Sequence, residues 1–119
     1  MRKKIRLFKE FKFFSFKVLF FGLIEYLKIF FCTININFKK KKIKFYINSE
    51  MSLVRAVLFG KKEKEVYNFI DKYLNSDDIF FDIGANVGVF SIYSSVFKKA
   101  KCIAFEPEFS NLYLLKKNV

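Results

Sequence analysis

The spacing of apolar residues changes along this chain, and each spacing predicts a different element. Residues 1–31 are rich in Phe, Leu and Ile over most of a helical surface. Wound as a helix, this segment places four charged residues on one narrow stripe: Glu10, Lys17, Glu25 and Lys28. The pattern predicts one long helix, or two in succession, because Gly22 is a weak point in a helix.

Three interpretations of this first segment compete. A membrane span needs about 18 or more apolar residues with few charges, whereas the run from Val18 to Phe31 has 14 residues and includes Glu25 and Lys28. A signal peptide needs an unbroken apolar core and small residues at the cut, and neither is clear. We therefore expect either a helix in the membrane interface, with its basic residues toward anionic headgroups, or a helix that packs on protein.

Residues 33–76 begin with period-two alternation and end with helical spacing. Thr33–Phe38 and Ile43–Ile47 alternate between apolar and polar residues, which predicts two short strands in a hairpin around a run of lysines. SLVRAVLFG, residues 52–60, predicts a further strand. KKEKEVYNFIDKYLN, residues 61–75, predicts an amphipathic helix with four apolar residues on one side: Val66, Phe69, Ile70 and Leu74.

Residues 77–119 predict a strand, a helix, a strand and a helix. The predicted elements are Ile79–Ile83, Val87–Phe97, Lys101–Phe105 and Phe109–Asn118. The first strand is apolar enough to be buried on both faces, and the last helix is expected to turn Leu112 and Leu115 inward. Parallel strands joined in this way form the nucleus of a doubly wound α/β sheet.

The charge is uneven along these parts. Residues 76–119 contain five lysines and five acidic residues, so the whole formal net charge of +12 lies in residues 1–75. The chain thus divides into a basic amphipathic helical segment (1–32), short strands and a helix (33–76), and the neutral strand–helix part (77–119). The basic front suits peripheral contact with an anionic membrane. Evenly spread aromatic residues argue against a nucleic-acid surface.

Cysteine and histidine usage limits the chemistry. The chain has no histidine, and its two cysteines, Cys32 and Cys102, lie far apart without a CxxC motif. We therefore expect neither a metal site nor a disulfide framework. A reducing cytoplasm fits best, with peripheral contact at the inner face of the membrane left open.

The turn after the first strand of this last part, in IFFDIGANVGVF, carries the candidate chemistry. A dinucleotide site needs GxGxxG, because its glycines make room for a pyrophosphate. Here Gly84 and Gly88 are present, the middle glycine is missing, and Asp82 precedes the turn. A carboxylate at this place repels a pyrophosphate and attracts a cation, which argues against NAD and FAD. S-adenosylmethionine, with a sulfonium and an ammonium group and no phosphate, fits this preference.

A second acid follows the second strand of the same part. Glu106 comes 22 residues after Gly84, and Pro107 ends the strand there. A carboxylate at this place can accept hydrogen bonds from both ribose hydroxyls. Because NAD-binding folds use the same device, Glu106 indicates a nucleoside, and the preference for a methyl donor depends on Asp82 and the turn. The alternative to a ligand site is a generic strand–helix turn, in which an acid near the N-terminus of the helix is favourable by itself.

These residues resemble a known family. The chain is similar to the opening of the FkbM-type S-adenosylmethionine-dependent methyltransferases in two segments, FFDIGANVGVFSIY (80–93) and IAFEPEFSNLYLLKKN (103–118). That family also has an asparagine at a position like that of Asn118. The resemblance implies a Rossmann-like methyltransferase sheet and O-methylation of a sugar, glycan or other hydroxylated acceptor. It implies cofactor-binding roles for five residues: Asp82, Gly84, Asn86 and Gly88 beside the methionine part, and Glu106 at the ribose. Glu63 or Glu65 is a loose match to a further family glutamate.

The family pattern continues beyond the part that resembles this chain. We therefore expect an N-terminal fragment of a methyltransferase, with a cofactor crevice, without turnover by itself and without an assignable catalytic base. Two alternatives stay open. One is a membrane-associated or nucleotide-binding module without catalysis; the other is a nucleotide-dependent oxidoreductase, which the missing GxGxxG disfavours.

Overall fold

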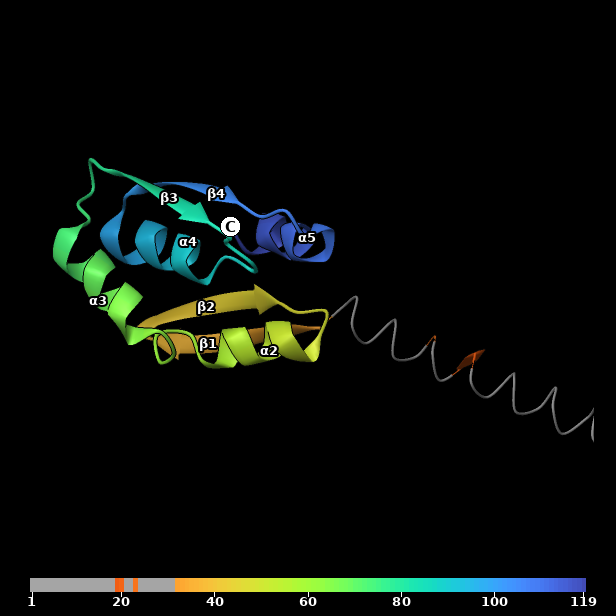
Figure 1. Cartoon of the computed structure of the whole chain (residues 1–119). Helices are drawn as coiled ribbons and strands as arrows, with labels where there is room; N and C mark the ends of the chain where they lie inside the picture. Colours follow the sequence, from red (N-terminus) through yellow and green to blue (C-terminus); the bar gives the residue numbers. More distant parts are fainter. Residues whose placement is uncertain (1–18, 21–22, 24–31) are drawn as a thin grey trace, which may run out of the picture. The chain divides into compact units, whose positions relative to one another are not determined.

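The computed structural model describes residues 19, 20, 23 and 32–119, and Figure 1 shows the fold of residues 32–119. The predicted helix over residues 1–31, with its contact to membrane or protein, lies outside the described residues apart from these three positions. Among the helices that are described, none is both long and apolar enough to cross a membrane. Residues 32–119 form a unit of their own.

A β-hairpin opens this unit, as the alternation predicts. Strands β1 (Thr33–Phe38) and β2 (Lys41–Tyr46) pair antiparallel, with Phe38 opposite Lys41. The two-residue turn between them has positive φ at both Lys39 (44°) and Lys40 (65°), as a type I′ hairpin turn requires. Strand β2 begins at Lys41 and not at Ile43, so half of the lysine run belongs to the strand.

The predicted strand over residues 52–60 is wrong, because this segment forms helix α2 (Glu50–Val57). Ser49 caps the helix: its side chain accepts a hydrogen bond from the backbone of Ser52, and the Ser52 hydroxyl accepts one from the backbone N–H of Ser49. Ser52 and Ala56, one helical turn apart, are buried. The capping box decides for a helix over a stretch whose valines and leucines also suit a strand.

Helix α3 (Lys64–Tyr73) confirms the predicted amphipathic helix, but its buried face differs in part from the predicted one. Tyr67 and Ile70 are buried, and Leu74 follows them at the helix end. Phe69, predicted to face inward, is 58% exposed. The helix is therefore rotated so that the tyrosine, whose apolar ring and polar end suit a partly polar core, takes the inner position.

The last part has the predicted order of elements. Strands β3 (Ile79–Ile83) and β4 (Lys101–Phe105) pair parallel, with Asp82 opposite Ala104. Helix α4 (Val89–Tyr93) and the π-helix η1 (Ser94–Lys98) connect them. Helix α5 (Phe109–Asn118) follows. The connecting helix thus begins at Val89 and not at Val87, since the preceding residues are used by the turn.

Burial of β3 on both faces was predicted and is wrong within the described structure. Phe80 is half-buried and Asp82 is buried, whereas the alternate residues Ile79, Phe81 and Ile83 are 50%, 56% and 82% exposed. Helix α4 lies against one face of the β3–β4 pair (Figure 1). In α5, the buried pair is Leu114 and Leu115, while Leu112 is half-buried.

Aromatic rings form the centre of the unit. Phe59 lies at the middle of the group: its ring centroid is 5.4 Å from that of Phe38 and of Phe45, and 6.1 Å from that of Tyr67 and of Tyr93. The rings come from both strands of the hairpin, from the α2–α3 connection, from α3 and from α4. They join the hairpin to the β3–β4 part as one core.

A polar clamp reinforces this core. The Tyr93 hydroxyl donates to the Asp71 carboxylate at 2.9 Å and accepts from the Lys39 ammonium at 2.5 Å, and Lys39 also pairs with Asp71 at 3.1 Å. The clamp ties the hairpin turn to α3 and α4. The described residues therefore form a mixed α/β fold with two small sheets and four α-helices.

Candidate functional site

The turn from Gly84 to Gly88 lies where β3 ends and the chain passes to α4. Three of its residues have positive φ: Gly84 (80°), Asn86 (52°) and Gly88 (90°). The glycines adopt this conformation at little steric cost, and asparagine is among the few other residues that visit it readily. The GAN-x-G pattern is therefore explained first by the shape of the turn.

Every backbone N–H group of this turn already donates within the chain. Gly84 and Ala85 donate to the Phe105 carbonyl at 2.8 and 2.9 Å. Asn86 donates to the Glu106 carboxylate at 2.7 Å, and Val87 donates to the Asn86 side-chain oxygen at 3.0 Å. Gly88 donates to the Ala85 carbonyl at 2.8 Å. The turn is closed by its own hydrogen bonds and tied to the end of β4.

Asp82 lies beneath the turn and not in an open crevice. It is 6% exposed, and its carboxylate accepts from the Ser91 hydroxyl at 2.6 Å. Burial raises the pKa of Asp82, hydrogen bonds from the side chain and backbone of Ser91 oppose this rise, and the negative charge of Glu106 adds to it. In the described structure Asp82 thus supports α4 and contributes negative potential to the turn through the protein.

Glu106 follows β4 and holds two backbone groups. One carboxylate oxygen accepts from the Asn86 N–H at 2.7 Å, and the other accepts from the Glu108 N–H at 2.9 Å. Each carboxylate oxygen can accept a second hydrogen bond, and Glu106 is only half-buried. The residue is therefore preorganised by the two turns and keeps acceptor capacity for a ligand.

The two glycines of the motif have different surroundings. A Cβ atom built on Gly84 has no heavy atom within 4 Å, so this side of the turn is open. A Cβ atom on Gly88 lies 2.8 Å from the Leu115 side chain and 3.0 Å from that of Val119. Gly88 is therefore closely packed against α5 and the residue after it.

Asn118 links three parts of the fold. Its side-chain N–H donates to the Val87 carbonyl at 2.9 Å, and its side-chain oxygen accepts from the Tyr46 N–H at 2.7 Å. The asparagine that contributed to the family resemblance therefore holds the turn against the edge of β2. This is a structural role that the sequence did not specify.

The fold thus gathers all five predicted site residues at the carboxyl ends of β3 and β4. Asp82 and Glu106 lie within electrostatic reach of one another, and neither forms an ion pair with a cationic side chain within the described part of the chain. Among the same residues, no group of three or more carboxylates and cysteines has the geometry of a metal site. The end of the β3–β4 pair thus carries two carboxylates, one buried and one half-buried, without a cationic partner among the described residues.

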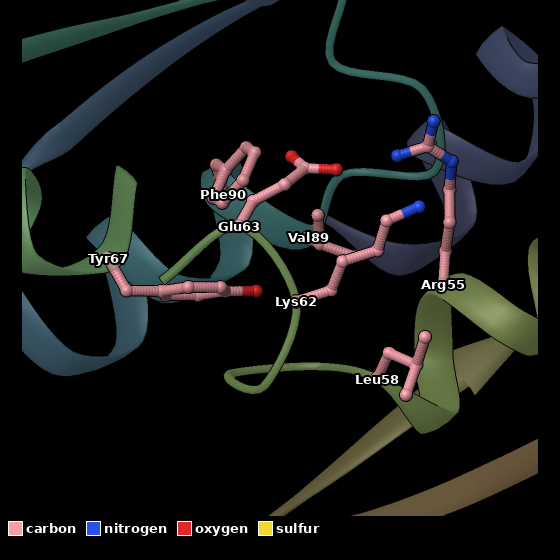
Figure 2. A pocket seen from close by; sticks show the side chains of 7 residues that line it. All are labelled: Arg55, Leu58, Lys62, Glu63, Tyr67, Val89 and Phe90. Atoms are coloured by element: carbon pink, nitrogen blue, oxygen red, sulfur yellow. The ribbon is translucent and has the colours of Figure 1, made fainter. Parts of the chain in front are cut away.

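A small cavity next to the turn contains residues that the sequence did not identify. Arg55 and Lys62 line it together with Glu63 and the first residues of α4, as Figure 2 shows. The sequence indicated no link between Arg55 and the turn, because its segment was predicted to be a strand. Glu63 was considered only as a loose family match.

Comparisons with protein-family models, with curated proteins and with solved structures found no match to this chain.

Proposed function

We propose that the turn binds the nucleoside of S-adenosylmethionine, and that the chain contributes this cofactor site to a methyltransferase of the FkbM type. The observation that carries the proposal is the hydrogen-bond arrangement of the turn. Its five N–H groups all have partners within the chain. Sites for pyrophosphate need free N–H groups directed at the ligand. A phosphate-free ligand is therefore favoured over NAD or FAD.

Charge supports the same choice. A pyrophosphate over this turn would approach Asp82 and Glu106, two acids without a cationic partner among the described residues. A sulfonium would be attracted by both. Since Asp82 is buried and bonded to Ser91, we infer that it acts on the ligand by its field and not by direct contact. In a low-dielectric interior this field is weakly screened.

Glu106 is the proposed ribose ligand. Its carboxylate is already oriented by the N–H groups of Asn86 and Glu108, so little side-chain entropy is lost when the two ribose hydroxyls bind. Gly84 offers open space beside it. The parallel β3–β4 pair with its helical connection supports a Rossmann-like arrangement, in which ligands bind beyond the carboxyl ends of the strands.

The reaction that follows from the family resemblance is O-methylation of a sugar, glycan or other hydroxylated acceptor. Methyl transfer is a displacement at the sulfonium carbon, so the protein has to place an acceptor oxygen opposite the sulfur. We assign no base toward this oxygen among the residues at the turn, because Asp82 is buried against Ser91 and Glu106 is the proposed ribose ligand. The proposal for this chain is therefore cofactor binding.

Thermal unfolding of the full chain with S-adenosylmethionine, S-adenosylhomocysteine and NAD tests the cofactor. We expect the first two to raise the unfolding temperature and NAD to have no effect. Glu106→Gln should weaken binding about tenfold, as loss of a charged acceptor does. Glu108→Gln is the matched control, because Glu108 is exposed and caps α5. Stabilisation by NAD alone, or by none of the three, would show that the proposal is wrong.

Peripheral membrane binding is a second proposal, supported by the hairpin. Lys40, Lys42 and Lys44 are exposed on it, and such clusters attract anionic headgroups. Vesicles of anionic lipid should pellet the full chain at low salt, and replacing these three lysines by glutamine should reduce the bound fraction. Equal pelleting of both proteins would count against a contact through the hairpin.

A further inference from the structure

Helix α2 has the reverse polarity of an ordinary surface helix. Its buried residues are Ser52 and Ala56, a polar and a small side chain. Its larger apolar residues point outward: Met51, Leu53, Val54 and Val57 are 61%, 37%, 38% and 41% exposed. A surface helix normally turns its apolar stripe toward the core and its polar residues toward water. These four residues, the outer face of α2, are therefore an apolar surface that the described fold leaves uncovered.

Exposed lysines lie at the C-terminal end of α2. The helix contacts β1, on the side of the unit away from β3 and β4 (Figure 1). The hairpin turn is close to the helix end, since the rings of Phe38, which ends β1, and Phe59, which follows α2, have centroids 5.4 Å apart. Lys40 in that turn is exposed, and so are Lys61 and Lys62 after the helix.

The charge of this part of the chain favours an anionic partner. Residues 33–65 contain nine lysine and arginine residues and three acidic residues, a net charge of +6. Anionic lipid headgroups attract such clusters of basic residues. The same charge disfavours a second copy of the chain as the cover of α2, because the pairing would bring two positive surfaces together.

The residue types on the outer face of α2 also favour lipid over protein. None of its four residues is aromatic, although 21% of the chain is. The residues that contribute most to protein–protein binding are Trp, Tyr and Arg, whereas Leu and Val are under-represented among them. Apolar side chains next to basic residues are typical of segments that lie in a membrane interface.

From polarity, charge and composition together, we propose that the outer face of α2 inserts into the interface of an anionic bilayer, with the neighbouring lysines at the headgroups. The inference rests on the proposed peripheral membrane binding, to which it adds the element that enters the lipid. Two signals act together in this arrangement, since a basic cluster holds the protein at the surface and an apolar face anchors it there.

A fluorescent reporter tests the insertion directly. The chain has no tryptophan, so Met51→Trp places a single one on the outer face of α2. Vesicles of phosphatidylserine and phosphatidylcholine should shift its emission to shorter wavelengths, and brominated acyl chains should quench it. Vesicles of phosphatidylcholine alone should do neither. Phe69→Trp on α3 is the matched control, because Phe69 is 58% exposed against 61% for Met51, and its emission should stay unchanged.

A pelleting assay measures the contribution to binding. Met51→Gln combined with Val54→Gln should lower the partition of the full chain onto anionic vesicles about tenfold, because burial of an apolar side chain contributes a factor of this order. Phe69→Gln combined with Tyr73→Gln removes two exposed apolar side chains from α3 and should leave pelleting unchanged. Circular dichroism checks that each variant folds. If the α2 variant does not fold, the reporter decides.

The outcomes separate the two proposals. Pelleting without a change in the emission of Met51→Trp, as a contact through the hairpin or residues 1–31 alone would give, would overturn the insertion of α2 and leave peripheral binding standing. An equal shift with phosphatidylcholine alone would overturn the choice of an anionic surface. A shift that grows with protein concentration without lipid would assign the face to a second copy and overturn the proposal. No pelleting by either kind of vesicle would overturn peripheral membrane binding, and the insertion with it.

Discussion

Replacing Gly88 by alanine tests the link between the turn and α5. Gly88 has φ of 90°, and a methyl group there would lie 2.8 Å from the Leu115 side chain and 3.0 Å from that of Val119. Val119 is 65% exposed and can move, whereas Leu115 is 4% exposed and has little room. The substitution therefore adds steric overlap against a buried residue to the strain of a left-handed backbone.

Gly84→Ala separates these two effects. Gly84 has φ of 80°, similar to that of Gly88, but no heavy atom lies within 4 Å of its built Cβ atom. Left-handed strain in a non-glycine residue is about 1–2 kcal/mol, and overpacking a core position adds about 1–3 kcal/mol. We expect Gly84→Ala to lower the free energy of unfolding by the first amount and Gly88→Ala by the sum of both, about 2–5 kcal/mol.

Urea unfolding followed by far-ultraviolet circular dichroism measures both variants. The midpoints should move with little change in m, since the surface exposed on unfolding is nearly the same. The difference between the variants, about 1–3 kcal/mol, is the overlap with α5 alone. Equal losses for the two variants would refute the packing of the turn against Leu115, and with it the position of α5 beneath the proposed site.

Three further predictions concern the acid below the turn, the polar clamp and the capping box. Burial raises the pKa of Asp82 above its ordinary 3.8, so the folded state binds a proton at this carboxylate more tightly than the unfolded state does. Protonation of Asp82 therefore stabilises the fold below pH 3.8, and this contribution is lost as the pH rises through the raised pKa. The free energy of unfolding of Asp82→Asn, measured by urea titration at several pH values, should therefore fall less than that of the unmodified chain as the pH rises from 3.8 through the raised pKa. Parallel pH profiles of the two proteins would contradict this prediction. Tyr93→Phe removes hydrogen bonds to Asp71 and to Lys39 and should lower the free energy of unfolding by about 1 kcal/mol, with a smaller effect in an Asp71→Asn background by a double-mutant cycle. Ser49→Ala removes the α2 cap and should cost about 1 kcal/mol in chemical unfolding, and no loss would mean that α2 does not depend on its cap.

Local patterns in the sequence predicted most elements of residues 33–119. Period-two alternation identified both strands of the hairpin, because side chains of a strand point alternately to opposite faces. The apolar runs around the GAN-x-G turn identified the parallel strands and the helices between and after them. The exception was α2, whose branched residues suit a strand; a cap made by two serines was the signal that could have corrected it.

The gathering of the site residues followed from the same patterns, but their environments did not. The succession of strand, helix and strand along the sequence predicted that Asp82, Glu106 and the two glycines lie at the ends of neighbouring parallel strands, because two strands joined by one helix usually pair parallel. Only the tertiary structure decided that Asp82 is buried against Ser91, that Gly88 meets α5, and that Arg55 lies beside the turn. These contacts join residues from different elements, and their burial depends on how the helices pack, which no short-range pattern encodes.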